Sequence, residues 1–125
     1  MRPIKKERKK KKLTSRQVSA LVAKAAEDKK AKDIKIIDVR KSSDLTDFFV
    51  IVSGESSPQL KAILKGIEEG VNKLRKLKQK WEGSISSNWL ILDLGDVIVH
   101  IMGEEERKRY KLEDLWQKSA IIYHE

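Results

Sequence analysis

The stretch DFFVIVSGESSPQLKAILKG (47–66) decides the fold. Its first eight residues are apolar at nearly every position, which is typical of a strand that is covered on both faces of a sheet. Pro58 suits the first turn of a helix, where its missing N–H costs nothing, and Ser56 or Ser57 can cap that helix. Apolar side chains then recur at helical spacing, so the sequence predicts a long helix over residues 56–80.

One helix and one strand are predicted before this unit. Residues 14–32 carry apolar side chains at helical spacing, and Thr14 and Gln17 have the spacing of a capping box. DIKIIDVR (33–40) is short, β-branched and alternating, as expected of a strand. The polar link 41–46 is short enough for this strand and the next to be antiparallel neighbours.

A hairpin is predicted after the long helix, in NWLILDLGDVIVHIM (88–102), with Gly95 providing the positive φ of its turn. Because a helical crossover normally joins parallel strands, we expect the strand before the helix to run parallel to the first arm of the hairpin. Beyond the charged stretch 104–110, residues 111–119 predict a short helix, and 121–125 either a last strand or a loose end. The predicted fold class is α/β, a mixed β-sheet flanked by helices.

The net charge of +9 is concentrated at one end of the chain. MRPIKKERKKKK (1–12) holds eight basic residues and one acidic residue, whereas the rest of the chain holds 20 basic and 18 acidic residues. We therefore predict a disordered basic arm over residues 1–13 and one domain over residues 14–125. The arm is either a solvated extension or a contact to rRNA phosphates, which would add affinity without base specificity.

The composition excludes several classes of protein. The chain has no cysteine, which excludes disulfides and thiolate metal sites. It also has no apolar run near the roughly 20 residues that span a membrane, and no apolar stretch follows the basic N-terminus as in a secretory signal. We expect a soluble, cytoplasmic protein.

Catalytic constellations are weak. His100 and His124 stand on unrelated elements, so we expect no metal site and no cofactor. The enzymatic alternative is a nucleotidyltransferase, which holds a triphosphate on a Gly-Ser turn and binds metals through paired carboxylates. Residues 54–57 resemble such a turn, but a glutamate replaces its serine. Asp93 and Asp96 are three residues apart and flank a turn, so they do not project together from one strand.

Aromatic and apolar residues gather late in the chain, in a region otherwise full of charge: Trp89, Tyr110, Leu112, Leu115 and Trp116. Large rings normally contribute to a core. They are also enriched as anchors of protein-binding surfaces. Composition alone leaves both interpretations open.

Three composite motifs carry a resemblance to a known family. They are DLTDFFVIVSGESSPQLKAI (44–63), WLILDLGDVIVHIM (89–102), and Tyr110 with LEDLW (112–116). In this order they closely resemble the Iojap-like ribosomal silencing factors, over about residues 14–118. The departures are small: Phe48 stands where the family often has Tyr, and Met102-Gly103 where it often has Phe and His or Asn.

The resemblance implies a non-catalytic domain whose fold is similar to the nucleotidyltransferase scaffold, without that chemistry. It implies binding to the large ribosomal subunit through the ribosomal protein numbered fourteen, which blocks joining with the small subunit and represses translation when nutrients are short. A role in late large-subunit assembly and a homodimer in the free state are further implications. By motif position, the expected partner-binding residues are Trp89, Asp93, Asp96, His100, Tyr110, Leu112, Leu115 and Trp116. Structural roles in turns and caps are expected for Asp47, Gly54, Ser56, Ser57 and Gln59.

Overall fold

A computed structural model describes residues 13–74, 81–112, 114 and 120–124 of the chain. Its elements are, in order, α2 (Ser15–Asp28), β1 (Lys32–Asp38), β2 (Phe48–Gly54), α3 (Ser57–Asn72), β3 (Trp81–Ser84), β4 (Trp89–Asp93), β5 (Val97–Gly103), α4 (Glu104–Tyr110) and β6 (Ala120–His124). Of the basic arm predicted over residues 1–13, residues 1–12 lie outside the described residues, and Leu13 packs against the apolar core. No helix of the described part is long and apolar enough to cross a membrane.

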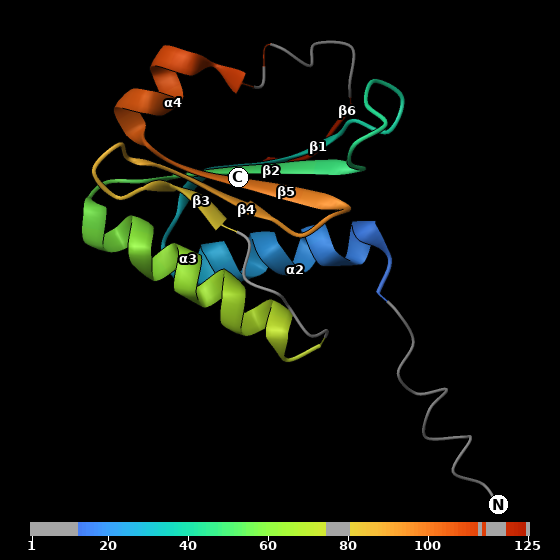
Figure 1. The fold of residues 1–125 in the computed structure, drawn as a ribbon, viewed down its shortest axis with the longest axis horizontal. Helices are drawn as coiled ribbons and strands as arrows, with labels where there is room; N and C mark the ends of the chain where they lie inside the picture. Colours follow the sequence, from blue (N-terminus) through green and yellow to red (C-terminus); the bar gives the residue numbers. More distant parts are fainter. Residues whose placement is uncertain (1–12, 75–80, 113, 115–119, 125) are drawn as a thin grey trace, which may run out of the picture.

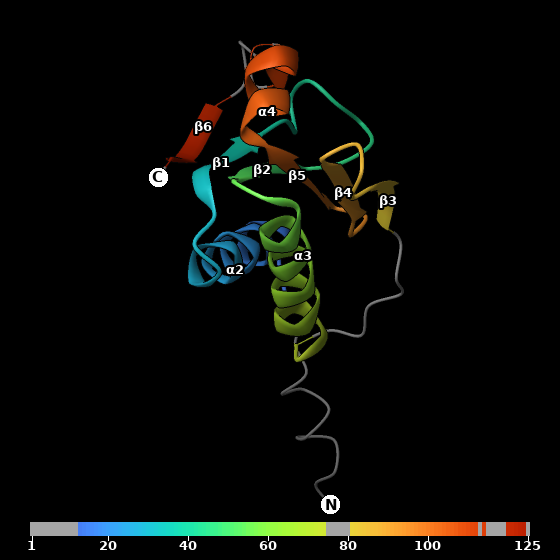
Figure 2. The same ribbon diagram turned by 90° about the vertical axis from the view of Figure 1, so that its left-hand side faces the viewer.

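One six-stranded sheet of order β3-β4-β5-β2-β1-β6 forms the centre of the molecule. Helices α2 and α3 cover one of its faces, and the short α4 lies on the other (Figure 1). Figure 2 shows the same layers after a quarter turn. Strands β2 and β5 are parallel, and the other pairs are antiparallel. The predicted α/β class, with a mixed sheet flanked by helices, is confirmed.

The sheet separates two apolar clusters of different size. The larger cluster lies between the sheet and helices α2 and α3, and includes Val22, Phe48, Ile63, Leu90 and Val99. The smaller cluster, on the opposite face, consists of Ile37, Val39, Ile51 and Met102, with Phe49, Trp89 and Leu112 packed against it. Alternation of side chains along each strand sends neighbouring residues to different clusters.

The predicted direction of the first arm of the hairpin was wrong. Strand β4 is antiparallel to β5, and β5 is parallel to β2, so β4 runs opposite to β2. The reason is β3, a strand that the sequence did not predict. It follows α3 in the direction of β2, and the chain then turns back into β4. WEGS (81–84) is short, mostly exposed and contains a glycine, so it lacks the apolar alternation of a typical strand.

The helices also differ from the prediction. Helix α2 ends at Asp28 instead of residue 32, and Lys30 adopts a positive φ of 67°. Helix α3 ends at Asn72, and residues 75–80 lie outside the described part. Helix α4, Glu104–Tyr110, was not predicted, and acidic residues in its first turn and basic residues in its last turn suit the helix dipole. Of the short helix predicted at 111–119, Leu112 and Asp114 are in 3-10 conformation, and residues 113 and 115–119 lie outside the described part.

The end of the chain forms a strand, which settles the alternative left open by the sequence. Strand β6 pairs antiparallel with β1, so Ile37 lies opposite Ile121. The predicted antiparallel pairing of β1 with β2 is likewise confirmed. Strand β1 is therefore an inner strand of the sheet.

Helices α2 and α3 pack closely at the two glycines of α3. A Cβ atom on Gly70 would lie 3.7 Å from the Cβ of Ala25, and one on Gly66 would lie 2.9 Å from Cε of Lys29. A side chain at Gly70 would thus make an ordinary contact with α2, whereas one at Gly66 would displace the side chain of Lys29, the C-cap of α2.

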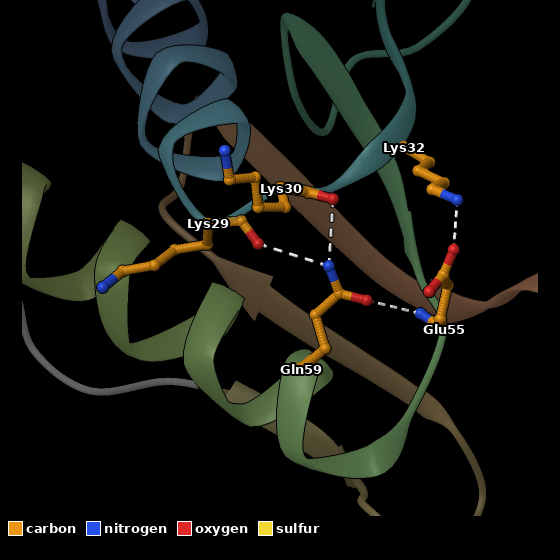
Figure 3. A network of polar contacts seen from close by, with 5 residues as sticks. All are labelled: Lys29, Lys30, Lys32, Glu55 and Gln59. Atoms are coloured by element: carbon orange, nitrogen blue, oxygen red, sulfur yellow. Dashed lines mark hydrogen bonds and ion pairs between the residues drawn. The ribbon is translucent and has the colours of Figure 1, made fainter.

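Gln59 connects three segments at the start of α3 (Figure 3). Its Nε2 donates hydrogen bonds to the carbonyls of Lys29 and Lys30, at 3.3 and 2.9 Å, and its Oε1 accepts one from the backbone N–H of Glu55 at 2.6 Å. Lys32 and Glu55 form an ion pair beside it. One side chain therefore fastens the end of α2 and the end of β2 to the first turn of α3.

The other residues with expected structural roles occupy the same kinds of position. Ser56 caps α3 by accepting a hydrogen bond from the N–H of Gln59, and Ser57 donates one to Asn88. A Cβ atom on Gly54 would lie 2.8 Å from Leu60, so the chain needs glycine there. The backbone N–H of Asp47 donates to the carbonyl of Asp96.

We predict that Gln59→Ala lowers the free energy of unfolding by about 1–3 kcal/mol, because three backbone groups lose their side-chain partner. Urea unfolding of the full chain measures the loss. Gln17→Ala is the matched control, since Gln17 occupies the same position in α2 but bonds only to Thr14 of its own helix. Equal losses in the two variants would contradict the linking role of Gln59.

Candidate partner-binding surface

The sheet face opposite α2 and α3 is only partly covered. On it lie half-buried Phe49 of β2, Trp89 and Ile91 of β4 and Ile98 of β5, and at its border Tyr110 of α4 is 47% exposed. We call these five residues the open face. Helix α4 has only seven residues and lies over one end of the sheet (Figure 1), and the described residues place no other helix on this face. Half-exposed apolar side chains in such a continuous arrangement indicate an interaction surface.

Three of the expected partner-binding residues form one cluster. The indole Nε1 of Trp89 donates a hydrogen bond to Nδ1 of His100 at 3.1 Å. The ring centroid of Trp89 lies 4.8 Å from that of Tyr110, and the ring centroids of Phe49 and His100 lie 5.4 Å apart in a T-shaped arrangement. The rings of β2, β4, β5 and α4 therefore hold one another in fixed positions.

His100 is at the buried centre of this cluster and is 9% exposed. Burial lowers the pKa of His100 to about 4, because the charged imidazolium would lose its hydration. Its Nδ1 accepts the hydrogen bond from Trp89, which assigns the remaining proton to Nε2. At neutral pH His100 is uncharged and hydrogen-bonded, and it supports the more exposed rings of this surface.

Helix α4, which carries Tyr110, is held to the sheet by a buried arginine. Arg107 is 6% exposed and donates a hydrogen bond from Nη1 to Oγ of Ser53 at 2.8 Å. Its Nη2 lies 3.5 Å from a carboxylate oxygen of Asp33. The guanidinium thus ties α4 to β2 and β1, and so fixes the position of Tyr110.

Asp93 and Asp96 lie apart from the rings, at the hairpin turn. Asp93 is exposed, shares the face of Trp89 and Ile91 by alternation, and accepts a hydrogen bond from the N–H of Gly95 at 2.8 Å. Four strand residues separate it from Trp89, or about 13 Å. The carbonyl of Asp96 accepts hydrogen bonds from residues 47 and 48, which anchors the turn to β2.

The closing motif is only partly described. Leu112 is half-buried and packs against the smaller apolar cluster. Leu115 and Trp116 lie outside the described residues. The sequence analysis did not single out Phe49, Ile91 and Ile98. Side chains two residues apart in a strand share a face, so Ile91 lies on the face of Trp89 and Ile98 on the face of His100. Phe49 lies on the same face in the neighbouring strand.

The nucleotidyltransferase constellation is not assembled. Residues 54–57 stand at one end of β2 and Asp96 contacts the other end, six residue steps away, a separation of about 20 Å. The turn faces a cavity of about 270 Å³ lined also by Glu104, Glu105 and Glu106, whose charge repels phosphate. In the described part of the chain, no group of three or more His, Asp or Glu side chains could hold a metal ion.

His100 generates a prediction on pH dependence. Between pH 6.5 and about 4 the unfolded chain binds a proton that the folded chain excludes from His100, so the stability falls as the pH is lowered through this range. The depressed pKa accounts for a loss of about 3 kcal/mol. Urea unfolding at pH 7 and pH 4.5 should show a shallower pH dependence for His100→Leu than for the wild type, since both share the same carboxylates. Parallel profiles would mean that His100 titrates normally.

Several known proteins are similar to this chain in sequence. The family model described as ribosomal silencing factor during starvation matches residues 12–124. The ribosomal silencing factor of Bacillus subtilis is 35% identical over 109 residues, which cover 87% of this chain and 92% of that protein. A mouse protein named mitochondrial assembly of ribosomal large subunit protein 1 is 36% identical over 89 residues, covering 69% of this chain and 39% of that protein.

A solved structure supports the same relationship. The crystal structure of a protein from Chromobacterium violaceum superposes with a TM-score of 0.79 at 31% identity, covering 84% of this chain and 88% of that one. Both the sequence match and the fold extend over most of the chain. The chain belongs to the family of ribosomal silencing factors.

Proposed function

We propose that this protein binds the large ribosomal subunit through the ribosomal protein numbered fourteen, prevents joining with the small subunit and thereby represses translation. Membership of the silencing factor family supports the ribosomal role. The name of the mouse relative, which refers to assembly of the large subunit, supports the choice of subunit and a further part in late assembly.

The observation that carries the proposal is the pair formed by Trp89 and Tyr110 on the open face. Aromatic side chains that are held rigidly and remain accessible are typical anchors of protein interfaces, because they bury a large area with little loss of conformational entropy. Trp89 is positioned by His100 and Tyr110 by α4. The pair therefore presents a pre-organised apolar patch to a partner.

In this proposal the other motif residues surround or extend the aromatic pair. Asp93 and Asp96 would form a polar rim that favours a basic partner. Leu112, Leu115 and Trp116 would extend the apolar patch from the closing motif.

Steric exclusion requires no reaction. A factor that occupies the contact surface of one subunit lowers the concentration of subunits able to join, and its effect depends on affinity and position alone. We therefore assign the protein a non-enzymatic role. The basic arm would strengthen binding through rRNA phosphates and would make the affinity sensitive to salt.

We predict that Trp89→Ala and Tyr110→Ala each weaken binding to purified large subunits about 10- to 100-fold, the range expected when an aromatic anchor is removed. Co-sedimentation across a range of factor concentrations measures the affinity. Leu74→Ala is the control, because Leu74 is a 58% exposed apolar residue in the helix layer. Circular dichroism verifies that each variant is folded. Wild-type affinity in both aromatic variants would place the partner on another surface.

We further predict that the wild-type protein reduces the fraction of joined ribosomes when it is mixed with both subunits. Sucrose-gradient sedimentation separates joined ribosomes from free subunits. The reduction should follow the occupancy of the large subunit and should be weaker for Trp89→Ala at the same concentration. If joined ribosomes form as readily with saturated large subunits as without the factor, binding does not exclude the small subunit.

A further inference from the structure

A second exposed tryptophan lies on the opposite layer of the molecule. Trp81 is the first residue of β3, the edge strand, and is 40% exposed. It pairs with Leu92, whose side chain belongs to the larger core, so Trp81 points toward the α3 side of the sheet. The next residue, Glu82, points to the other side. Among the described strands, β3 has β4 as its one neighbour and forms the edge of the sheet (Figure 2).

The indole borders a groove between β3 and α3. The groove has a volume of about 460 Å³, and its apolar lining includes Pro58, Leu64 and Ile85. Lys61 and Lys65 of α3 complete its rim. These lysines are exposed and one helical turn apart. Their long side chains can therefore contact a bound ligand at two points.

Positive charge predominates around this groove. Its acidic lining residue is Glu68, and partial burial raises the pKa of that carboxyl. The sequence directly before Trp81 is RKLKQK (75–80), with four basic residues and no acidic one. In the sequence, Trp81 is therefore preceded by a strongly basic run, which favours an anionic ligand.

We propose that this groove binds single-stranded RNA, with one base stacked on Trp81 and the flanking phosphates on Lys61 and Lys65. An accessible indole face combined with cations at its border is the arrangement that sequence-tolerant single-strand binding uses. An apolar peptide would fill the groove equally well in shape but would leave the lysines without partners. Charge complementarity therefore favours RNA.

The RNA groove is separate from the open face. Trp81 lies on the helix side of the sheet, whereas Trp89 and Tyr110 lie on the other side. A large subunit bound at the open face could therefore be contacted at the same time by the groove through a single-stranded rRNA segment. RNA binding by the groove does not depend on the proposed silencing function, so the two can fail separately.

The test uses the full chain and two fluorescein-labelled probes: an oligouridylate and an abasic ribose-phosphate chain of equal length. Fluorescence anisotropy measures both affinities. Trp81→Leu should weaken oligouridylate binding about 5- to 150-fold, the fold-change that corresponds to the loss of one base stack. It should leave binding of the abasic probe unchanged. Trp81→Phe should retain most of the affinity, because phenylalanine still offers a ring.

Two further variants complete the design. Lys61→Ala combined with Lys65→Ala should weaken binding of both probes. It should also flatten the dependence of log affinity on log salt by about 0.7 for each phosphate that the protein no longer neutralises. Glu82→Ala is the control on the other side of β3 and should not weaken binding of either probe. Every variant keeps residues 1–12, so any contribution of the basic arm is the same in all of them.

Two results would overturn the proposal. One is wild-type affinity of Trp81→Leu for oligouridylate, and the other is an equal loss of affinity for both probes. If Trp81→Leu kept its RNA affinity but bound the large subunit more weakly, the groove would bind protein and the RNA assignment would be wrong. Urea unfolding of the Leu and Phe variants shows whether a loss reflects folding, since Trp81→Phe changes the same packing.

Discussion

The parallel pairing of β2 with β5 is the constraint on which the rest of the structure depends. It runs without interruption from Phe48 opposite Val97 to Gly54 opposite Gly103. Parallel neighbours cannot be joined by a tight turn, so the chain must leave β2, cross the sheet as α3 and return at its far edge. That crossover places α3 on the face that α2 also covers, and the large apolar cluster lies between these two helices and the sheet. In the described part of the chain, one short helix, the α4 that follows β5, lies on the opposite face.

This unequal cover explains where the surface of interest lies. A sheet in an α/β protein is usually covered on both faces, and its strands are correspondingly apolar. Here β2 has the apolar sequence of a covered strand, yet Phe49 on its second face is only half-buried. Arg107 holds α4 in place over one end. Among the described residues, no other helix lies over the rest of the face, which keeps the apolar side chains of a buried sheet. Such a face is suited to contact with a partner.

Sequence reasoning predicted most of the fold because its main signals are local. The apolar run of β2, the serine and proline that start α3, and the glycine turn of the hairpin each determine an element by themselves. Strand β3 was missed because its pairing with β4 is a tertiary effect that four mostly exposed residues do not encode. Missing it also assigned the wrong direction to β4. The order of strands in a sheet depends on contacts between distant segments, which periodicity does not report.

The candidate site was predictable only in part, for a related reason. Motif positions selected Trp89, His100 and Tyr110, and the structure brings these three together. They could not show that His100 is buried beneath the other rings, because its burial depends on Phe49 from another strand. At this buried position a neutral imidazole has a lower desolvation cost than a charged one. Covering a charged histidine with a partner would cost its hydration, whereas an uncharged one already bonded to Trp89 loses little when the surface is buried. The open face is therefore uncharged at its centre before any partner arrives, and the energy of association can come from its rings.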